Sequence, residues 1–172
     1  DSSETVLQTT EVSVPDGQSR RTHRVTLPDT SYVEEFKDSS ETVLQTTEVS
    51  VPDGQSRRTH RVTLPDTSYV EEFKDSSETV LQTTEVSVPD GQNRRTHRVT
   101  QPDTSFVEEF KDDSENVLQT TEVSSPDILN RRTHKVIQPD TSFVEEFKDA
   151  SDNVLQTTEV SIPDLENRRT RK

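Results

Sequence analysis

A tandem repeat of 37 residues runs through the whole 172-residue chain and constrains its fold more than any other feature. The complete copies span Asp1–Lys37, Asp38–Lys74, Asp75–Lys111 and Asp112–Lys148, and a partial fifth copy covers Asp149–Lys172. The first two copies are identical, and the later ones drift at a few positions. A free-standing solenoid would need atypical capping units at its ends, and neither end of this chain carries one. We therefore expect the chain to be a section of a longer array.

Each copy contains short segments in which β-branched residues alternate with polar ones, a pattern that predicts strands. In the first copy the predicted strands are Thr5–Val14, Arg20–Leu27 and Ser31–Phe36. A Pro-Asp pair follows each of the first two segments, and the polar run Lys37–Ser40 follows the third, so turns are expected at all three places. A Ser-x-x-Glu capping pattern leaves a short helix over Ser31–Lys37 open as an alternative for the third segment.

The pair Asp16-Gly17 resembles the signal of a tight two-residue hairpin. In the fourth and fifth copies, however, Ile128 and Leu165 take the place of the glycine. A branched residue at positive φ is costly. The sequence therefore predicts that Gly17 does not adopt a left-handed conformation, and the tight hairpin is rejected.

The composition argues against a single globular core. Hydrophobic residues make up 24% of the chain, charged residues 31%, and the net charge is −14. Such a chain buries too little apolar surface to offset its conformational entropy easily. If a buried seam exists, its members are the apolar residues that keep their identity in every copy that includes them: Val6, Leu7, Val12, Val25, Val33 and Phe36.

The predicted fold is a β-rich extended tandem-repeat array with about three short strands per unit. Two physical states fit it. The units form a solenoid-like stack, or the chain is extended or disordered and becomes ordered on a partner. A stack places identical residues above one another, so Glu34-Glu35 and Arg20-Arg21 would form unfavourable like-charge ladders.

Several functional classes are excluded by composition. The longest apolar run is two residues, so no transmembrane segment is expected. No enzymatic activity, cofactor or metal is expected, because the chain lacks cysteine and has little apolar material from which to build a pocket. His23 and its copies lie among arginines, which disfavours a bound cation. Nucleic-acid binding is not expected, because the chain is acidic and poor in aromatic residues.

The most distinctive charge feature is the basic cluster Arg20–Arg24 inside an acidic unit. It either docks on acidic partners or pairs with Glu11, Glu34 and Glu35 of its own or a neighbouring unit. We predict that this cluster, together with the apolar residues after it, contacts protein partners. The predicted contact residues are Arg20, Arg21, Arg24, Val25, Tyr32, Val33, Phe36, Arg57, Arg58, Arg61, Val62, Tyr69, Val70, Phe73, Arg94, Arg95, Arg98, Val99, Phe106, Val107, Phe110, Arg131, Arg132, Lys135, Val136, Phe143, Val144 and Phe147.

The stretch from Thr10 to Val25, an acidic β-like segment followed by a basic run, resembles the Ser/Thr/Glu/Pro-rich tails of giant ankyrins. The resemblance implies a cytoskeletal adaptor, and hence a cytoplasmic, cytoskeleton-associated location, with an extracellular location left open. The predicted function is a structural, multivalent scaffold or spacer that binds protein partners, with binding to a second copy of itself left open. Repetition of one weak site can raise affinity by ~10²–10⁴-fold. The alternatives are a self-associating fibre and an extracellular glycosylated stalk.

Overall fold

The computed structural model describes residues 7–164 and 168–172, and these residues form thirteen strands and no helix. The chain divides into two compact units, one ending at Thr83 and the other beginning at Thr84. The strands are β1 (Thr9–Val12), β2 (Arg21–Thr26), β3 (Tyr32–Lys37), β4 (Val43–Val49), β5 (Arg58–Thr63), β6 (Tyr69–Lys74), β7 (Val80–Val86), β8 (Arg95–Thr100), β9 (Phe106–Lys111), β10 (Val117–Val123), β11 (Arg132–Ile137), β12 (Phe143–Lys148) and β13 (Val154–Val160). The boundary between the units falls inside β7.

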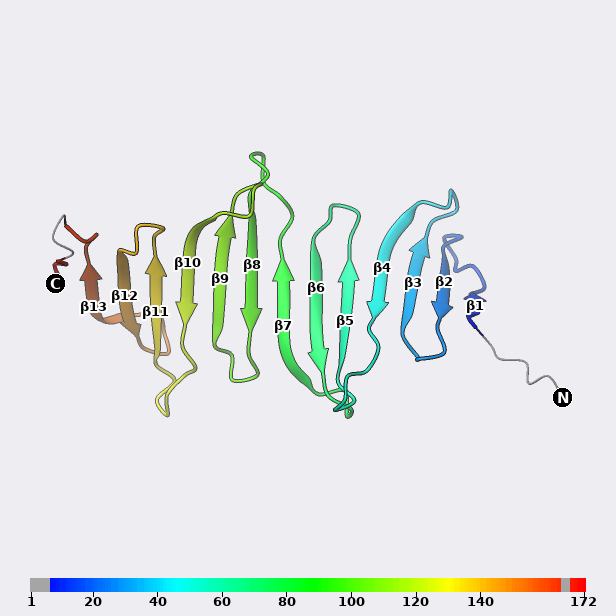
Figure 1. Ribbon diagram of the computed structural model, residues 1–172, viewed down its shortest axis with the longest axis horizontal. Coiled ribbons are helices and arrows are strands. Elements are labelled where there is room, and N and C mark those ends of the chain that lie inside the picture. Colours follow the sequence, from blue (N-terminus) through cyan, green and yellow to red (C-terminus); the bar gives the residue numbers. More distant parts are fainter. Residues whose placement is uncertain (1–6, 165–167) are drawn as a thin grey trace. The chain divides into compact units, whose positions relative to one another are not determined.

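Within each unit the strands form an open antiparallel meander (Figure 1). β1 to β6 follow one another in chain order in the first unit, and β8 to β13 do so in the second. The prediction of a β-rich chain with about three short strands per copy is confirmed. The alternative of a helix over Ser31–Lys37 is wrong, because β3 occupies this segment and pairs with β2 and β4. Thr5 and Val6, at the start of the first predicted strand, lie outside the described residues.

The meander differs from the solenoid-like stack that was one of the two expected states. Two other strands separate each strand from its copy in the next repeat, so identical residues are not neighbours in the described pairings. Arg24 instead pairs with Glu11 on one side and Glu34 on the other. The like-charge ladders expected of a stack are therefore replaced by opposite charges, and such cross-strand pairs contribute about 0.2–1 kcal/mol each.

The three turns of a copy share one conformation. In the turn between β2 and β3, the Leu27 N–H donates to the Ser31 carbonyl at 2.9 Å, and the Thr30 N–H donates to the Leu27 carbonyl at 2.9 Å. Thr30 has a φ of 68°, and Ser19 and Glu41 take the same place in the other two turns, with φ values of 60° and 63°. Each turn is thus a three-residue hairpin loop, a type I turn followed by a left-handed residue.

No glycine among the described residues has a positive φ, so the prediction for Gly17 is confirmed. A hairpin nevertheless forms there, because its left-handed residue is the serine two positions later. In the third and fourth copies that serine is replaced by Asn93 and Asn130, and asparagine tolerates this conformation better than most residues do. Leu165, the other residue on which the prediction rested, lies outside the described residues.

This turn geometry predicts that two substitutions, one that removes a glycine and one that introduces a glycine, both stabilise the chain. Gly54→Ala should raise the free energy of unfolding by about 0.4–1 kcal/mol, because it restricts only the unfolded chain. A Cβ at Gly54 meets nothing within 4 Å. Glu78→Gly should also stabilise, by about 0.5–1 kcal/mol, since it relieves a left-handed residue at φ 63°. Urea unfolding of the full chain measures both, with Ser77→Ala as the neighbouring control. Destabilisation by Gly54→Ala would contradict the turn assignment.

The buried apolar residues are three copies of one valine. Val49, Val86 and Val123 are 4–5% exposed, and no described side chain falls below 2%. Val12, their equivalent in the edge strand β1, is 52% exposed. Of the other predicted seam members, Leu7 and Val33 are exposed, Val25 and Phe36 are half-buried, and Val6 lies outside the described residues. The seam is therefore confirmed for the copies of Val12 in the second, third and fourth repeats and is wrong at Val12 itself, Leu7 and Val33.

Equivalent residues of neighbouring repeats lie on opposite faces of the sheet. Directly paired residues share a face, and adjacent residues of a strand do not. Along one face of the first unit the pairings give the row Val25, Val33, Glu48, Arg61 and Glu71. Along the other face they give the row Arg24, Glu34, Thr47, Val62 and Val70. Val25 and its copy Val62 thus point in opposite directions, and each face alternates a valine block with a Glu-Arg-Glu block.

Candidate functional site

The basic cluster is engaged within its own repeat. The Arg20 guanidinium forms an ion pair with Asp16 at 2.8 Å and lies 5.1 Å from the centre of the Phe36 ring. The Arg24 guanidinium lies 3.6 Å from the centre of the Tyr32 ring. Such cation–π contacts contribute about 0.5–1 kcal/mol at exposed sites. In the first copy the ion pair thus uses Asp16, whereas the expected pairing with a glutamate occurs in the third copy, where Arg98 lies 3.2 Å from Glu108.

The turn aspartates carry much of this local charge pairing. In the second copy, the Arg57 side chain and the backbone N–H groups of Arg57 and Gln55 donate to Asp53 and lower its pKa to about 2. Asp90 in the third copy has the same partners in Arg94 and Gln92, and its pKa is likewise lowered to about 2. These carboxylates are therefore ionised at neutral pH and close their turns.

In the second, fourth and fifth copies a second arginine of the cluster reaches back to the preceding repeat, a contact that sequence reasoning missed. Arg58 donates to the Thr30 carbonyl at 3.0 Å and to the Thr30 hydroxyl. Arg132 and Arg169 make the same pair of contacts with the threonine that lies 28 residues earlier, at 2.9 and 2.7 Å from its carbonyl. The constant spacing of this arginine from the preceding Pro-Asp-Thr turn is the sequence signal that could have indicated the contact.

The structure divides the predicted contact residues of each repeat between the two faces. In the first copy Val25 and Val33 share one face, whereas Arg24, Tyr32 and Phe36 share the other. The register places Arg21 with the valines, opposite Lys37. The predicted set is therefore not one continuous patch, and each face of a repeat presents only part of it.

A shallow groove lies on the sheet where one repeat meets the next, and we call it the junction groove. Between the first two repeats its volume is about 450 Å³, and its lining includes Val33 and Glu48. Hydroxyl groups lie toward one end, where the Thr59 N–H donates to the Ser50 hydroxyl at 2.9 Å. The side chains lining it on this face are Ser31, Val33, Glu48, Ser50, Thr59, Arg61 and Glu71.

The junction groove recurs in the second unit with the same composition. Between the third and fourth repeats it has a volume of about 350 Å³ and contains Val107, Glu122, Lys135 and Glu145. Between the fourth repeat and the partial fifth it has a volume of about 380 Å³ and contains Val144. The pairings Glu108–Thr121, Thr121–Val136 and Val136–Val144 place Val144 on the face opposite to Val107. Consecutive grooves of this unit therefore open on opposite faces.

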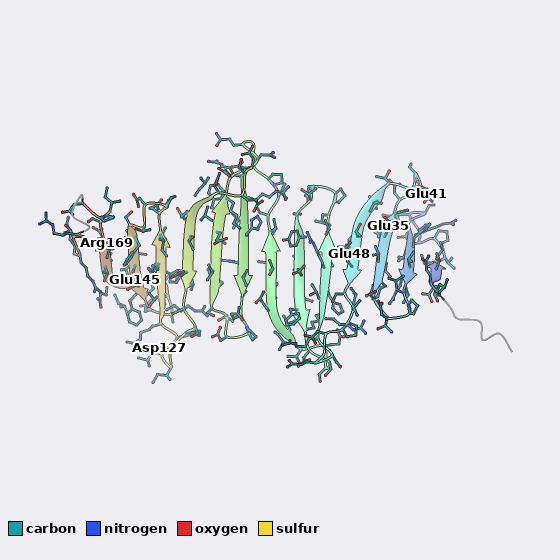
Figure 2. The ribbon with its side chains drawn as sticks, viewed as in Figure 1. Glu35, Glu41, Glu48, Asp127, Glu145 and Arg169 are labelled. Atoms are coloured by element: carbon teal, nitrogen blue, oxygen red, sulfur yellow. The ribbon has the colours of Figure 1, made fainter. Side chains whose placement is uncertain are left out.

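Two carboxylates flank a cation in each Glu-Arg-Glu block. Arg61 is paired in register between Glu48 and Glu71, yet its guanidinium lies 3.7 Å from the centre of the Tyr69 ring. Within the described part of the chain, no cation lies within ion-pair distance of either glutamate. In the second unit Lys135 approaches Glu122 only to 3.7 Å, and Glu122 is 47% exposed. Figure 2 shows Glu48 on β4 and Glu145 on β12. The grooves thus combine exposed valines with accessible negative charge.

The histidines occupy separate positions. His23 and His60 lie 3.9 Å from Glu41 and Glu78. Burial lowers the pKa of His134 below its ordinary value. Among residues 7–164 and 168–172, no group of three or more potential ligands is arranged to hold a metal ion.

Comparisons with known proteins add no relative. No protein-family model matches the chain, and no curated protein shows significant similarity to it. In the portion of the chain that the structure describes, no helix is long and apolar enough to cross a membrane.

Proposed function

We propose that this chain is a structural, multivalent scaffold that binds protein partners, in association with the cytoskeleton. The observation that supports it most directly is the recurrence of the junction groove, with the same residue types, at three repeat junctions. A repeated weak site gains affinity through multivalency, because each further contact is made within an existing complex.

The opposite orientation of consecutive grooves in the second unit adds a geometric argument. A single partner that lies along one face reaches only the grooves that open on that face. A second partner on the other face can then bind at the same time, which is the action of a scaffold. The cytoskeletal part of the proposal rests on the resemblance of Thr10–Val25 to the tails of giant ankyrins.

Co-sedimentation with purified actin filaments and with microtubules tests this function. We expect the full chain to sediment with one of these filaments. A chain in which residues 38–111 are deleted loses two whole repeats and keeps the strand order of the rest. Its affinity should fall at least about tenfold, because fewer sites remain. Equal affinity of the two chains would contradict multivalent binding, and failure to sediment with either filament would contradict the cytoskeletal assignment.

A further inference from the structure

The junction grooves have a chemistry that selects one kind of partner segment. Val33 in the first unit and Val107 in the second are each 43% exposed, although both lie in the middle of a strand pairing. Each is followed along its row by a glutamate, Glu48 or Glu122, that pairs directly with it. An exposed valine side chain therefore lies directly opposite a glutamate on the neighbouring strand.

In the first unit the cation of the block is held away from these carboxylates, because Arg61 is drawn toward Tyr69. In the second unit Arg98 forms an ion pair with Glu108 at 3.2 Å, and Lys135 forms one with Glu122 at 3.7 Å. Lys135 also lies 4.6 Å from the centre of the Phe143 ring. A bound cation could thus approach the two glutamates of a block without displacing an ion pair of the first unit. The chain as a whole carries a net charge of −14, which favours the approach of a basic partner at long range.

We propose that each junction groove binds an extended basic segment of a partner protein, in which a lysine lies two residues from a valine or isoleucine, so that both side chains project from the same side of the segment. The branched side chain packs on Val25 and Val33 or their copies. The lysine ammonium binds the glutamates of the adjoining block, and its aliphatic stem lies along the valines. This proposal names the partner class of the proposed function and rests on that function for its biological setting.

A second copy of the chain is a poorer occupant of the same surface. Its faces carry the same Glu-Arg-Glu blocks, and two chains that each carry −14 repel one another. The basic segment is therefore favoured by charge complementarity, which governs the encounter rate and the choice of partner at such surfaces.

The alternation of faces gives a further consequence in the second unit. Val107 and Val144 lie in consecutive grooves on opposite faces. Two basic segments can therefore bind to this unit at once without contact between them, and a single straight segment cannot occupy both grooves.

Titration calorimetry on the full chain in 150 mM salt tests the proposal with two synthetic probes at ~7 residues each, near the length of an ordinary strand. The first probe places lysine and valine in turn at every second position with serine between them, and the second replaces each valine with serine and has the same charge. We expect the lysine–valine peptide to bind at least about tenfold more tightly, because only it can bury apolar surface on the valines. Equal affinities would overturn the proposal and indicate binding by bulk charge alone.

A matched pair of quadruple variants locates the site. The groove variant carries Glu48→Gln, Glu71→Gln, Glu122→Gln and Glu145→Gln. The control variant removes the same four charges from the exposed turns through Glu41→Gln, Glu78→Gln, Glu115→Gln and Asp152→Asn. We expect the groove variant to lose at least about tenfold in affinity for the lysine–valine peptide and the control variant to lose much less. Equal losses would overturn the assignment to the grooves.

Circular dichroism and sedimentation velocity complete the test. An unchanged β signal in the groove variant shows that a loss of affinity is not caused by unfolding. Dimerisation of the full chain without any peptide binding would show that a second copy covers the grooves and would overturn the proposal. Filament binding that survives in the groove variant would overturn the groove as the partner site and leave the scaffold function standing. Peptide binding without filament binding would leave the groove standing as a site for basic segments and would overturn the cytoskeletal scaffold function.

Discussion

Val49→Ala should lower the free energy of unfolding by about 2 kcal/mol, through the lost burial of two methyl equivalents and the cavity left behind. Val49 is 4% exposed and pairs directly with Tyr32 of the preceding repeat and His60 of its own. Val123→Ala in the second unit should have an effect of the same size. Urea unfolding of the full chain, followed by far-UV circular dichroism, measures both.

Val12→Ala is the matched control, because the residue type and the position in the repeat are the same. Val12 is 52% exposed, so its replacement should change stability by less than about 0.5 kcal/mol. Equal effects at Val12 and Val49 would mean that burial between repeats does not hold the sheet together. The meander would then depend on its turns and backbone hydrogen bonds alone.

Tyr32→Ala is the second substitution with a large expected effect, a loss of about 2 kcal/mol. The change removes the aromatic neighbour of Val49 and the ring over which the Arg24 guanidinium lies at 3.6 Å. Tyr32→Phe should change stability by less than about 0.5 kcal/mol, since Phe106 and Phe143 occupy the same place in the third and fourth repeats. Urea unfolding distinguishes the two variants.

A double-mutant cycle shows whether the ring and the valine act together. We expect the effects of Tyr32→Ala and Val49→Ala to be non-additive by at least about 0.5 kcal/mol, as for residues in contact. Additive effects would contradict direct packing between the first and second repeats. Tyr32 and Val123 lie in separate units, so the effects of Tyr32→Ala and Val123→Ala on stability should be additive. This pair is the control for the cycle.

Much of the local structure could be predicted from the sequence. The alternation around Val25 and the Pro-Asp pairs indicated strands and turns at the observed places, because side-chain period and proline restriction are local properties. The replacement of the glycine by Ile128 correctly excluded a left-handed residue there. The helix alternative at Ser31 failed because pairing with β2 and β4 outweighs a local capping pattern.

The candidate site was predicted less well. Sequence reasoning placed Arg24, Val25 and Tyr32 in one contact set, since they lie close together in the chain. Their register places Val25 on the face opposite to the other two. Sequence reasoning also missed Glu48 as a groove residue. The groove is assembled from two repeats, and no pattern within one copy indicates which residues meet across the junction.

The sequence by itself determined the repeat, the strands, the turns and the acidic charge, since each depends on residues close together in the chain. Only the tertiary structure decided which faces the side chains occupy. Because each repeat contains three strands, equivalent strands of successive repeats run in opposite directions. The pairing register then places Val25 and Val62 on opposite faces. A register shifted by one residue would exchange the two faces of every strand that it moved, and no local sequence pattern fixes that shift.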